Sequence, residues 1–401
     1  MAWAQGKIAQ AVFLDVEGAF EKVWHLGLIA KLKQASITGK CLDLFESYLQ
    51  NRSQITVVDN VKSEVQYLKA GIPQGSRLGP LLFILYINDI QKDLESEILI
   101  FADDTTLLSF GANAQETTEA LNRDLIKISN WAAIWKVKFG ADKSREVLFS
   151  QKTVLDSPPL IFNTEIIKQV TVHKHLGVIL TNTLDWGPHV QFTIMKANRK
   201  IAVLRQIHYL QRRTLDMLYK VTVRSVLDFA LPVYYHTLKV CEKQRLEQIQ
   251  YKCAKLTCGA LHFTSQIKLN NELGLETIAT RADFLSLNTF HKILVGRTRP
   301  LVRSCMPTPT PFNEHSTRHR KLFLPYKSNS IKFTNSFFPK MAKKYENLPR
   351  SCRSKADPDL FKDELRSHLV PLQYKFLSRG SKLGGKFLTQ IRVGRSLLNS
   401  H

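Results

Sequence analysis

The sequence predicts an α+β protein in which an antiparallel sheet with helices on one face is followed by a mainly helical region. Up to residue 180, apolar segments of strand length alternate with segments of helical periodicity, which is typical of such a sheet. Beyond residue 180 the apolar spacing is helical to about residue 295, and four prolines then interrupt the chain. We therefore expect four regions: 1–180, 181–298, a proline-rich linker at 299–314 and a basic region at 315–401.

Apolar spacing and turn residues predict the first elements. Residues 11–16 (AVFLDV) read as a buried strand that ends at a carboxylate, and a second helix is expected at about 41–49. Two short strands, 54–58 and 65–69, should flank a turn at Asp59-Asn60. Between that first strand and the helix at about 41–49, an apolar stripe at helical spacing predicts another helix. The stripe consists of Phe20, Val23, Trp24, Leu28 and Leu32.

The next elements surround a pair of acids. Gly79-Pro80 opens a strongly apolar helix, because proline suits the first helical turn. Residues 98–102 and 105–110 predict a hairpin with Asp103-Asp104 at its tip. A helix at about 114–136 follows, and short strands at 146–150 and around 160–167 complete the region.

The charge balance points to a polyanionic partner. Lys and Arg total 57 against 34 acids, which gives a net charge of +23. Such a field concentrates nucleic acid, and the stretches 315–345 and 365–401 contain no acidic residue. No apolar run is long enough to span a membrane, and no signal peptide is recognisable, so we expect no membrane partner.

Three carboxylates stand beside apolar strands in a pattern that suits metal-assisted phosphoryl transfer. Asp15 ends one strand, and Asp103 and Asp104 occupy the hairpin tip. Mg²⁺ prefers oxygen ligands, and enzymes that transfer nucleotidyl groups commonly use two such ions. Asp15 and Asp103 are the expected bridging ligands, Asp104 an accessory one, and the Val16 carbonyl a further oxygen. A single aspartate after a strand would more often be a turn or cap residue.

The segments FLDVEGAF, GIPQGSRLGPLLFILYINDI and FADD resemble, in this order, palm motifs A, B and C of reverse transcriptases. More narrowly they are similar to those of non-LTR retrotransposons of the jockey-like class. WKVKFGADKSREVLFS resembles motif D, and HKHLGVIL resembles the segment that leads into the thumb. The similarity covers about residues 11–370. It implies a right-hand polymerase palm, a helical thumb at 181–298 and a basic C-terminal region.

The resemblance assigns roles to further residues. Phe20 takes the position of the aromatic residue that excludes a ribose 2′-hydroxyl, although it could equally be a core residue. Lys143 takes the position of a lysine that protonates pyrophosphate, although an isolated lysine is more often a solvated charge. Phe101 and Ala102 precede the paired acids. The loop that supports template and incoming base would contain Gly71, Pro73, Gln74, Gly75 and Ser76.

The implied function is RNA-directed DNA polymerase, with Mg²⁺ (or Mn²⁺ as a substitute), an RNA template, a DNA primer and deoxynucleoside triphosphates. The family also implies cytoplasmic ribonucleoprotein particles that reach the nucleus. No segment before residue 11 matches the family's fingers or endonuclease, so we expect an N-terminally truncated chain with a separate protein supplying those parts. The intact acids favour an active polymerase, whereas missing fingers favour the alternative, an inactive relic that only binds nucleic acid.

Overall fold

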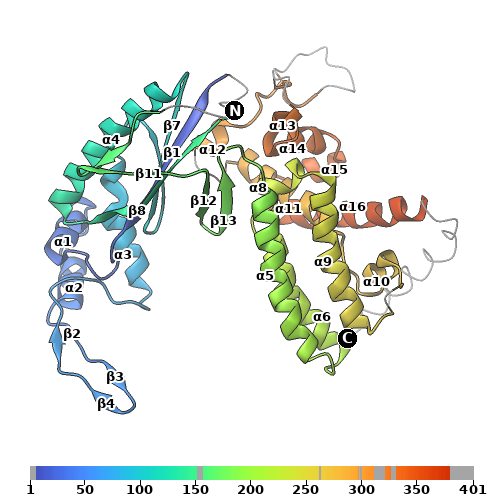
Figure 1. Ribbon diagram of the computed structural model, residues 1–401, viewed down its shortest axis with the longest axis horizontal. Coiled ribbons are helices and arrows are strands. Elements are labelled where there is room, and N and C mark those ends of the chain that lie inside the picture. Colours follow the sequence, from blue (N-terminus) through green and yellow to red (C-terminus); the bar gives the residue numbers. More distant parts are fainter. Residues whose placement is uncertain are drawn as a thin grey trace. The chain divides into compact units, whose positions relative to one another are not determined.

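The computed structural model describes residues 6–150, 157–261, 263–296, 298, 300–310, 321–326 and 331–379 of the chain (Figure 1). The chain divides into two compact units, the first ending at Asp185 and the second beginning at Trp186. The first unit contains a large sheet with helices packed on it, and the second is helical in its described part. The α+β class expected from the sequence is thereby confirmed.

The sheet of the first unit has the strand order β11-β8-β1-β7-β6. Its central strand, β1 (Ile8–Val16), is apolar and pairs antiparallel with strands on both sides. One neighbour is β7 (Asp104–Gly111), which forms a hairpin with β6 (Glu97–Phe101). The other is β8 (Phe139–Phe149), which begins seven residues earlier than the sequence pattern predicted. The edge strand β11 (Lys168–Gln169) pairs with β8 in parallel, so the sheet is not wholly antiparallel.

Helices cover one face of this sheet. Alternate residues of β1, such as Val12 and Leu14, point into a core shared with Leu107 of β7, because successive strand side chains face opposite sides. Leu28 and Leu121 are fully buried in the same core. The helices that contribute are α1 (His25–Gln34), α2 (Lys40–Leu49), α3 (Leu78–Ile87) and α4 (Ala114–Trp135).

A small hairpin covers part of the opposite face. It consists of β12 (Val172–His175) and β13 (Val178–Thr181), and Figure 1 shows it on the side of the sheet away from α4. The ring of Phe13 stacks on His173 at a centroid distance of 4.1 Å and lies 4.8 Å from His175. Beyond this hairpin, the end of β1 that carries Asp15 is only half-buried.

The helical stripe expected from Phe20 onward begins later than predicted. Residues 17–24 form a turn, and α1 starts only at His25. The amides of Glu21 and Lys22 both bond to the Gly18 carbonyl, and Gly18 has a φ of +61°, a conformation that ends helical propagation.

A two-stranded ribbon leads away from the end of α2, as expected (Figure 1). Its tip is a turn at Asp59-Asn60, where both residues have positive φ, the geometry of a type I′ hairpin turn. The paired segments are β2 (Ser53–Gln54) with β5 (Gln66–Tyr67), and β3 (Val57–Val58) with β4 (Val61–Lys62).

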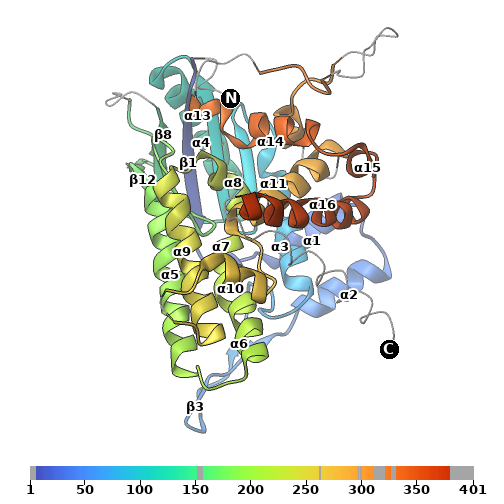
Figure 2. The same ribbon diagram turned by 90° about the vertical axis from the view of Figure 1, so that its right-hand side faces the viewer.

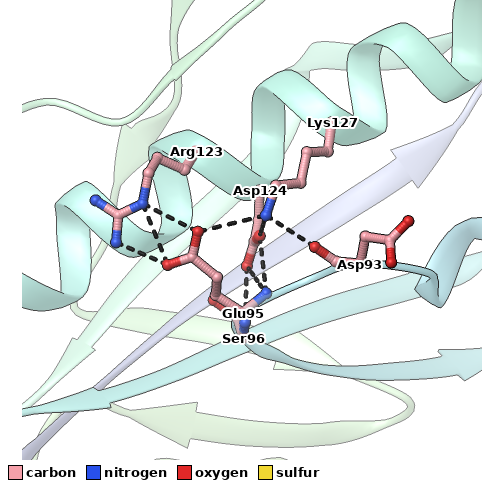
Figure 3. Close-up of polar contacts among 6 residues, drawn as sticks. All are labelled: Asp93, Glu95, Ser96, Arg123, Asp124 and Lys127. Atoms are coloured by element: carbon pink, nitrogen blue, oxygen red, sulfur yellow. Dashed lines mark hydrogen bonds and ion pairs between the residues drawn. The ribbon is translucent and has the colours of Figure 1, made fainter.

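A polar network attaches the residues directly before β6 to α4 (Figure 3). Asp124 is completely buried, and its carboxylate accepts hydrogen bonds from the amides of Glu95 (3.0 and 3.2 Å) and Ser96 (2.7 Å). The exposed Arg123 pairs with Glu95 through both carboxylate oxygens, and Lys127 contacts both acids. The Arg123 hydrogen bond lowers the pKa of Glu95 to about 2. Because β6 leads to the acidic hairpin tip, this network sets where that tip lies.

The smaller pairings of the first unit complete its outline. The region around 160–167 is a short hairpin of β9 (Ile161–Phe162) and β10 (Glu165–Ile166), rather than one strand. A 3₁₀ turn, η2 (Asn88–Gln91), follows α3. Lys31 of α1 is buried against the aromatic rings of Tyr86 and Trp135 and pairs with Asp89 of η2, which joins α1 to α3.

In the second unit, α5 (Gly187–Gln206) and α9 (Val240–Cys258) lie side by side, as both views show (Figures 1 and 2). A separate core forms around Phe290 of α11 (Ile278–Leu294), together with α14 (Phe337–Glu346) and α16 (Pro358–Arg379). The shorter helices are α6 (Arg212–Leu218), η3 (Tyr219–Arg224), α7 (Ser225–Asp228), α8 (Leu231–Tyr234), η4 (Tyr235–Thr237), α10 (Gln266–Glu272), α13 (Ile331–Thr334) and α15 (Arg350–Arg353).

The two regions predicted at the C-terminal end are only partly described. Within the predicted linker 299–314, residues Pro300–Ser304 form the helix α12, because proline is accommodated at a first helical position; 311–314 lie outside the described residues. Of the predicted basic region, 321–326 and 331–379 are described, and α14 and α16 share a core with α11. Within the described ranges, no helix combines the length and the apolar character that crossing a bilayer would require.

Candidate active site

The sheet brings the three predicted carboxylates to one end of adjacent strands. Leu14 of β1 pairs with Thr105 of β7, so the next residues along that register, Asp15 and Asp104, lie opposite each other. Both side chains point to the face that carries Phe13, away from the helices, because they alternate with the buried core positions. Asp103 follows at the exposed hairpin tip. Residues almost 90 positions apart in sequence therefore form one acidic site.

The hairpin tip is a tight two-residue turn. Phe101 pairs with Asp104, which leaves Ala102 and Asp103 as the two central residues. Ala102 has a φ of +52° whereas Asp103 does not have a positive φ, as in a type II′ turn, where glycine is the usual first residue. An alanine in this position carries backbone strain, and the turn holds the Asp103 carboxylate out from the sheet. The Phe101 ring beside it is 66% exposed.

The electrostatics of the site leave negative charge without a full counter-charge. Burial raises the pKa of the Asp104 carboxyl, and the charges of Asp103 and Asp15 raise it further. A charged His175 would lower the pKa of Asp104, but burial lowers the pKa of His175 itself, so at neutral pH this imidazole is largely uncharged. The acids therefore repel one another at neutral pH, and a cation placed among them would relieve that repulsion.

Lys143 reaches the site from the neighbouring strand. The pairing of β8 with β1 shifts between Phe13 and Asp15, and the extra residues form a bulge that carries Lys143. Its Nζ lies 3.8 Å from Oδ2 of Asp15, and the two side chains are 60% and 46% exposed. Such an exposed ion pair contributes little to stability, so Lys143 remains free to meet a substrate.

The carboxylate and carbonyl oxygens of this site are ligands of the kind that a divalent cation such as Mg²⁺ prefers. In the structure, however, these oxygens do not surround one common point. Among the described residues no group of three or more His, Cys, Asp or Glu side chains already has metal-binding geometry. Asp15 and Asp104 stand at the ends of neighbouring strands with Asp103 at the hairpin tip, and all three residues are at least partly exposed. The Val16 carbonyl lies on the same strand end as Asp15.

The loop at 71–76 packs directly against the turn that follows Asp15. The amide of Gly71 bonds to the Val23 carbonyl, and that of Ile72 bonds to the Phe20 carbonyl, both at 2.8 Å. Gly71 has a φ of +91°, and a Cβ built on it would lie 2.7 Å from the Glu21 carbonyl oxygen. Only glycine fits this position, because both the backbone conformation and the close approach exclude a side chain.

The remaining predicted loop residues surround this contact. Gln74 donates from Nε2 to Glu21 at 3.2 Å, and the Ser76 hydroxyl accepts from Tyr48 at 2.7 Å and from the amides that begin α3. Pro73 is half-buried, whereas Gly75 has positive φ and open space around it. The predicted loop therefore exposes Gln74 and Gly75 at its outer end.

Phe20 lies in the turn between β1 and α1. Its ring packs against Phe83 at a centroid distance of 5.1 Å and remains partly exposed. The two interpretations made from the sequence, a core residue and a residue that contacts the substrate, are therefore compatible in space.

Two residues of the site were not singled out from the sequence. His173 and His175 alternate along β12, so both rings face Phe13, and His175 lies 3.4 Å from the hydroxyl of Thr106, two residues after Asp104. Burial lowers the pKa of His173 to about 4, with a contribution from His175. The signal in the sequence was the spacing His-x-His on a strand, which places both rings on one face.

Comparison with known proteins adds a family match. The family model for reverse transcriptase (RNA-dependent DNA polymerase) matches residues 1–210. A probable RNA-directed DNA polymerase from transposon X-element of Drosophila melanogaster is 29% identical over 290 residues, which cover 69% of this chain and 31% of that protein. The RNA-directed DNA polymerase from mobile element jockey of Drosophila funebris is 30% identical over 262 residues, covering 62% and 28%. The chain thus spans about a third of the length of these curated relatives.

Among solved structures, a telomerase from Candida tropicalis in complex with a fragment of telomeric RNA is 10% identical and has a TM-score of 0.35. That likeness covers 67% of this chain and 49% of the telomerase chain. At this score, the likeness carries no argument about the fold or the site.

Proposed function

The chain belongs to the reverse transcriptase (RNA-dependent DNA polymerase) family, and from this premise we propose that it extends a DNA primer on an RNA template. The observation that carries the proposal is the meeting of Asp15 and Asp104 across β1 and β7, next to Asp103 at the hairpin tip. Three carboxylates at one strand end, where burial and then the two neighbouring acids raise the pKa of Asp104, suit cation-assisted nucleotidyl transfer.

Asp15, Asp103, Asp104 and the Val16 carbonyl would hold the cations, with Mg²⁺ the expected ion and Mn²⁺ a substitute. When bound, two such ions would activate the primer 3′-hydroxyl and offset the charge on the departing pyrophosphate. The chain itself supplies the backbone positions of these residues: the hairpin turn carries Asp103, and the β1–β7 register sets Asp15 opposite Asp104. The α4 network holds Glu95 and Ser96, directly before β6, and thereby supports the hairpin.

Lys143 would donate a proton to the leaving pyrophosphate. Its ammonium lies close to Asp15 but is more than half exposed, so it can turn toward a phosphate that displaces the weak ion pair. Phe20 and the outer end of loop 71–76 flank the same turn of the backbone. They would contact the sugar and base of a deoxynucleoside triphosphate while Gly71 keeps loop and turn together.

In this proposal the predicted region 1–180 is a polymerase palm, and the predicted region 181–298, whose described part is mainly helical, is a thumb. The palm assignment is supported by the sheet with helices on one face and acids on the other. The helices α14 and α16 would then be an extension that shares a core with the thumb helix α11. Ribonucleoprotein particles of cytoplasm and nucleus would be the place of action, as the sequence resemblance implied.

The test is Mg²⁺-dependent incorporation of dTTP on poly(rA)–oligo(dT). We expect wild-type protein to be active, and Asp103→Asn/Asp104→Asn to lose at least about 100-fold, because charge stabilisation at the reacting phosphate is lost. The matched control is Glu64→Gln/Glu165→Gln, which removes two exposed carboxylates of the first unit outside the site and should retain activity. Equal activity of the double variant and the control would exclude these acids from catalysis. A folded wild type that binds the template-primer but incorporates nothing would support the alternative of an inactive nucleic-acid-binding chain.

A further inference from the structure

Loop 71–76 fixes the backbone of Phe20. The Phe20 carbonyl accepts the Ile72 amide at 2.8 Å. The next residue, Glu21, lies directly against Gly71, where a built Cβ would come within 2.7 Å of the Glu21 carbonyl oxygen. The segment that carries Phe20 therefore cannot shift unless the loop shifts with it, and what freedom remains to Phe20 is the rotation of its side chain.

The ring of Phe20 rests on the ring of Phe83 in α3. The two ring centroids are 5.1 Å apart and the ring planes are tilted by 33°, within the range of favourable aromatic pairs. Phe83 is only 2% exposed and belongs to the core between the sheet and its helices, whereas Phe20 is half-buried. The partly exposed ring of Phe20 is thus supported from the inside by a close-packed core.

The helix that carries Phe83 is anchored to the same loop. The Ser76 hydroxyl accepts from the amides of the first two residues of α3 at 3.0 and 3.3 Å, and so satisfies two of the donors that a helix start leaves open. Ser76 also accepts from the hydroxyl of Tyr48 in α2 at 2.7 Å. Loop 71–76 therefore holds both partners of the ring contact: the backbone that carries Phe20 and the helix that carries Phe83.

We propose that Phe83 is a positioning residue for substrate specificity: it holds the Phe20 ring in place, so that the site rejects ribonucleoside triphosphates. The inference rests on the proposed function, in which Phe20 contacts the sugar of the incoming nucleotide. A ribonucleotide differs from a deoxyribonucleotide by one sugar hydroxyl, so rejection requires a ring that does not retreat. With Phe83 behind it, retreat would displace a buried ring in a close-packed core, which is unfavourable.

Shortening Phe83 should remove this support. Phe83→Leu keeps an apolar side chain but leaves a gap behind Phe20, because the surrounding core relaxes only partly. The Phe20 ring can then move back when a 2′-hydroxyl enters. We expect the ratio of kcat/KM for dUTP to kcat/KM for UTP to fall at least about 10-fold, through a rise in kcat/KM for UTP. The value for dUTP should change by less than about threefold, because deoxyribose fits without movement of the ring.

The test is incorporation of a single nucleotide into oligo(dT) on poly(rA) by the full chain. The substrates dUTP and UTP both pair with adenine and differ only in the 2′-hydroxyl. The matched control is Ile87→Val, which opens a small gap in the same core one turn further along α3 and should keep the ratio within about threefold. Phe83→Tyr keeps a ring behind Phe20 and should retain the wild-type ratio. If Phe83→Leu is inactive with both nucleotides, Phe83→Met replaces it, because methionine nearly keeps the volume but not the rigidity.

A double-mutant cycle decides whether Phe83 acts through Phe20. Phe20→Leu alone should lower the ratio at least as much as Phe83→Leu, and adding Phe83→Leu to it should change the ratio by less than about twofold. Additive effects, an unchanged ratio in Phe83→Leu, or an equal fall in Ile87→Val would overturn the inference while leaving an active wild type as a polymerase. An active wild type that does not prefer dUTP would overturn it as well. A wild type that incorporates neither nucleotide would refute the proposed polymerase and this inference with it.

Discussion

Replacing Asp124 by alanine should loosen the start of β6 and with it the acidic hairpin. The Asp124 carboxylate is completely buried at the inner side of α4 and accepts from two backbone amides, those of Glu95 and Ser96 (Figure 3). Truncation would remove the acceptor of both amides, of which one belongs to the half-buried Ser96 and the other to the exposed Glu95. Lys127 would lose one of its acidic contacts as well.

The magnitude follows from those contacts. A hydrogen bond to a charged group contributes at most about 3 kcal/mol, and these two are only part-buried, so we take about 1–2 kcal/mol for each. The pair with Lys127 adds less than about 1 kcal/mol, so Asp124→Ala should destabilise the first unit by roughly 2–5 kcal/mol. The natural comparison is Arg123→Gln, which removes the two-oxygen ion pair with Glu95. Those partners are 54% and 44% exposed, so the loss there should stay below about 1 kcal/mol.

Hydrogen exchange of the segment 93–101, followed by mass spectrometry, measures the local effect. An opening free energy lower by about 3 kcal/mol corresponds to exchange roughly 100-fold faster in this segment. Thermal unfolding of the same proteins reports the effect on the whole first unit. Protection unchanged within about threefold in Asp124→Ala, or equal losses in the Ala and Gln variants, would refute the claim that the buried carboxylate positions the hairpin.

Three further predictions concern the site itself. Gly71→Ala should cost at least about 2 kcal/mol in urea unfolding, because the methyl group would meet the Glu21 carbonyl in a positive-φ backbone; a neutral effect would mean that the loop can move away. Asp104→Asn should raise Tm at pH 7. The gain in Tm should shrink as pH falls through the raised pKa of the wild-type carboxyl, because protonation of Asp104 removes the same buried negative charge that the substitution removes. An unchanged Tm at pH 7 would contradict the raised pKa. The free energy of unfolding of the wild type should fall as pH drops from about 6.5 toward 4, because His173 takes up its proton at higher pH in the unfolded chain than in the folded one. His173→Phe, which keeps the stack on Phe13, should reduce that fall. Identical profiles of stability against pH for the two proteins would rule out this contribution.

Much of the site could be predicted from local sequence because its parts are local. The hairpin with Asp103-Asp104 at its tip follows from two apolar segments of strand length around two polar residues, and the structure places β6 and β7 there. The glycine at position 71 was recognised as a loop residue in the same way. The reason that it must be glycine, a backbone contact with Glu21, involves a residue 50 positions away and is invisible in the pattern.

Where local signals competed, the sequence pattern was wrong at the boundaries. The apolar stripe from Phe20 continues into α1. Up to Val23, however, the backbone follows the Gly18 turn and bonds to loop 71–76, so it does not form a helix there. β8 was predicted too short because the polar residues at its beginning interrupt the apolar pattern of a strand. They are tolerated there because they lie in the bulge, where Lys143 is exposed and close to Asp15.

The sequence by itself determined the α+β class, the order of the motifs and the identity of the three acids, because strand and helix periodicity and turn chemistry act between residues close along the chain. Only the tertiary structure decided which partners those residues meet. The register of β1 against β7 places Asp15 opposite Asp104, and the packing of α14 on α11 brings Lys344 to Asp283. Such meetings depend on how faces of distant elements pack against each other, and a periodic pattern carries no information about that.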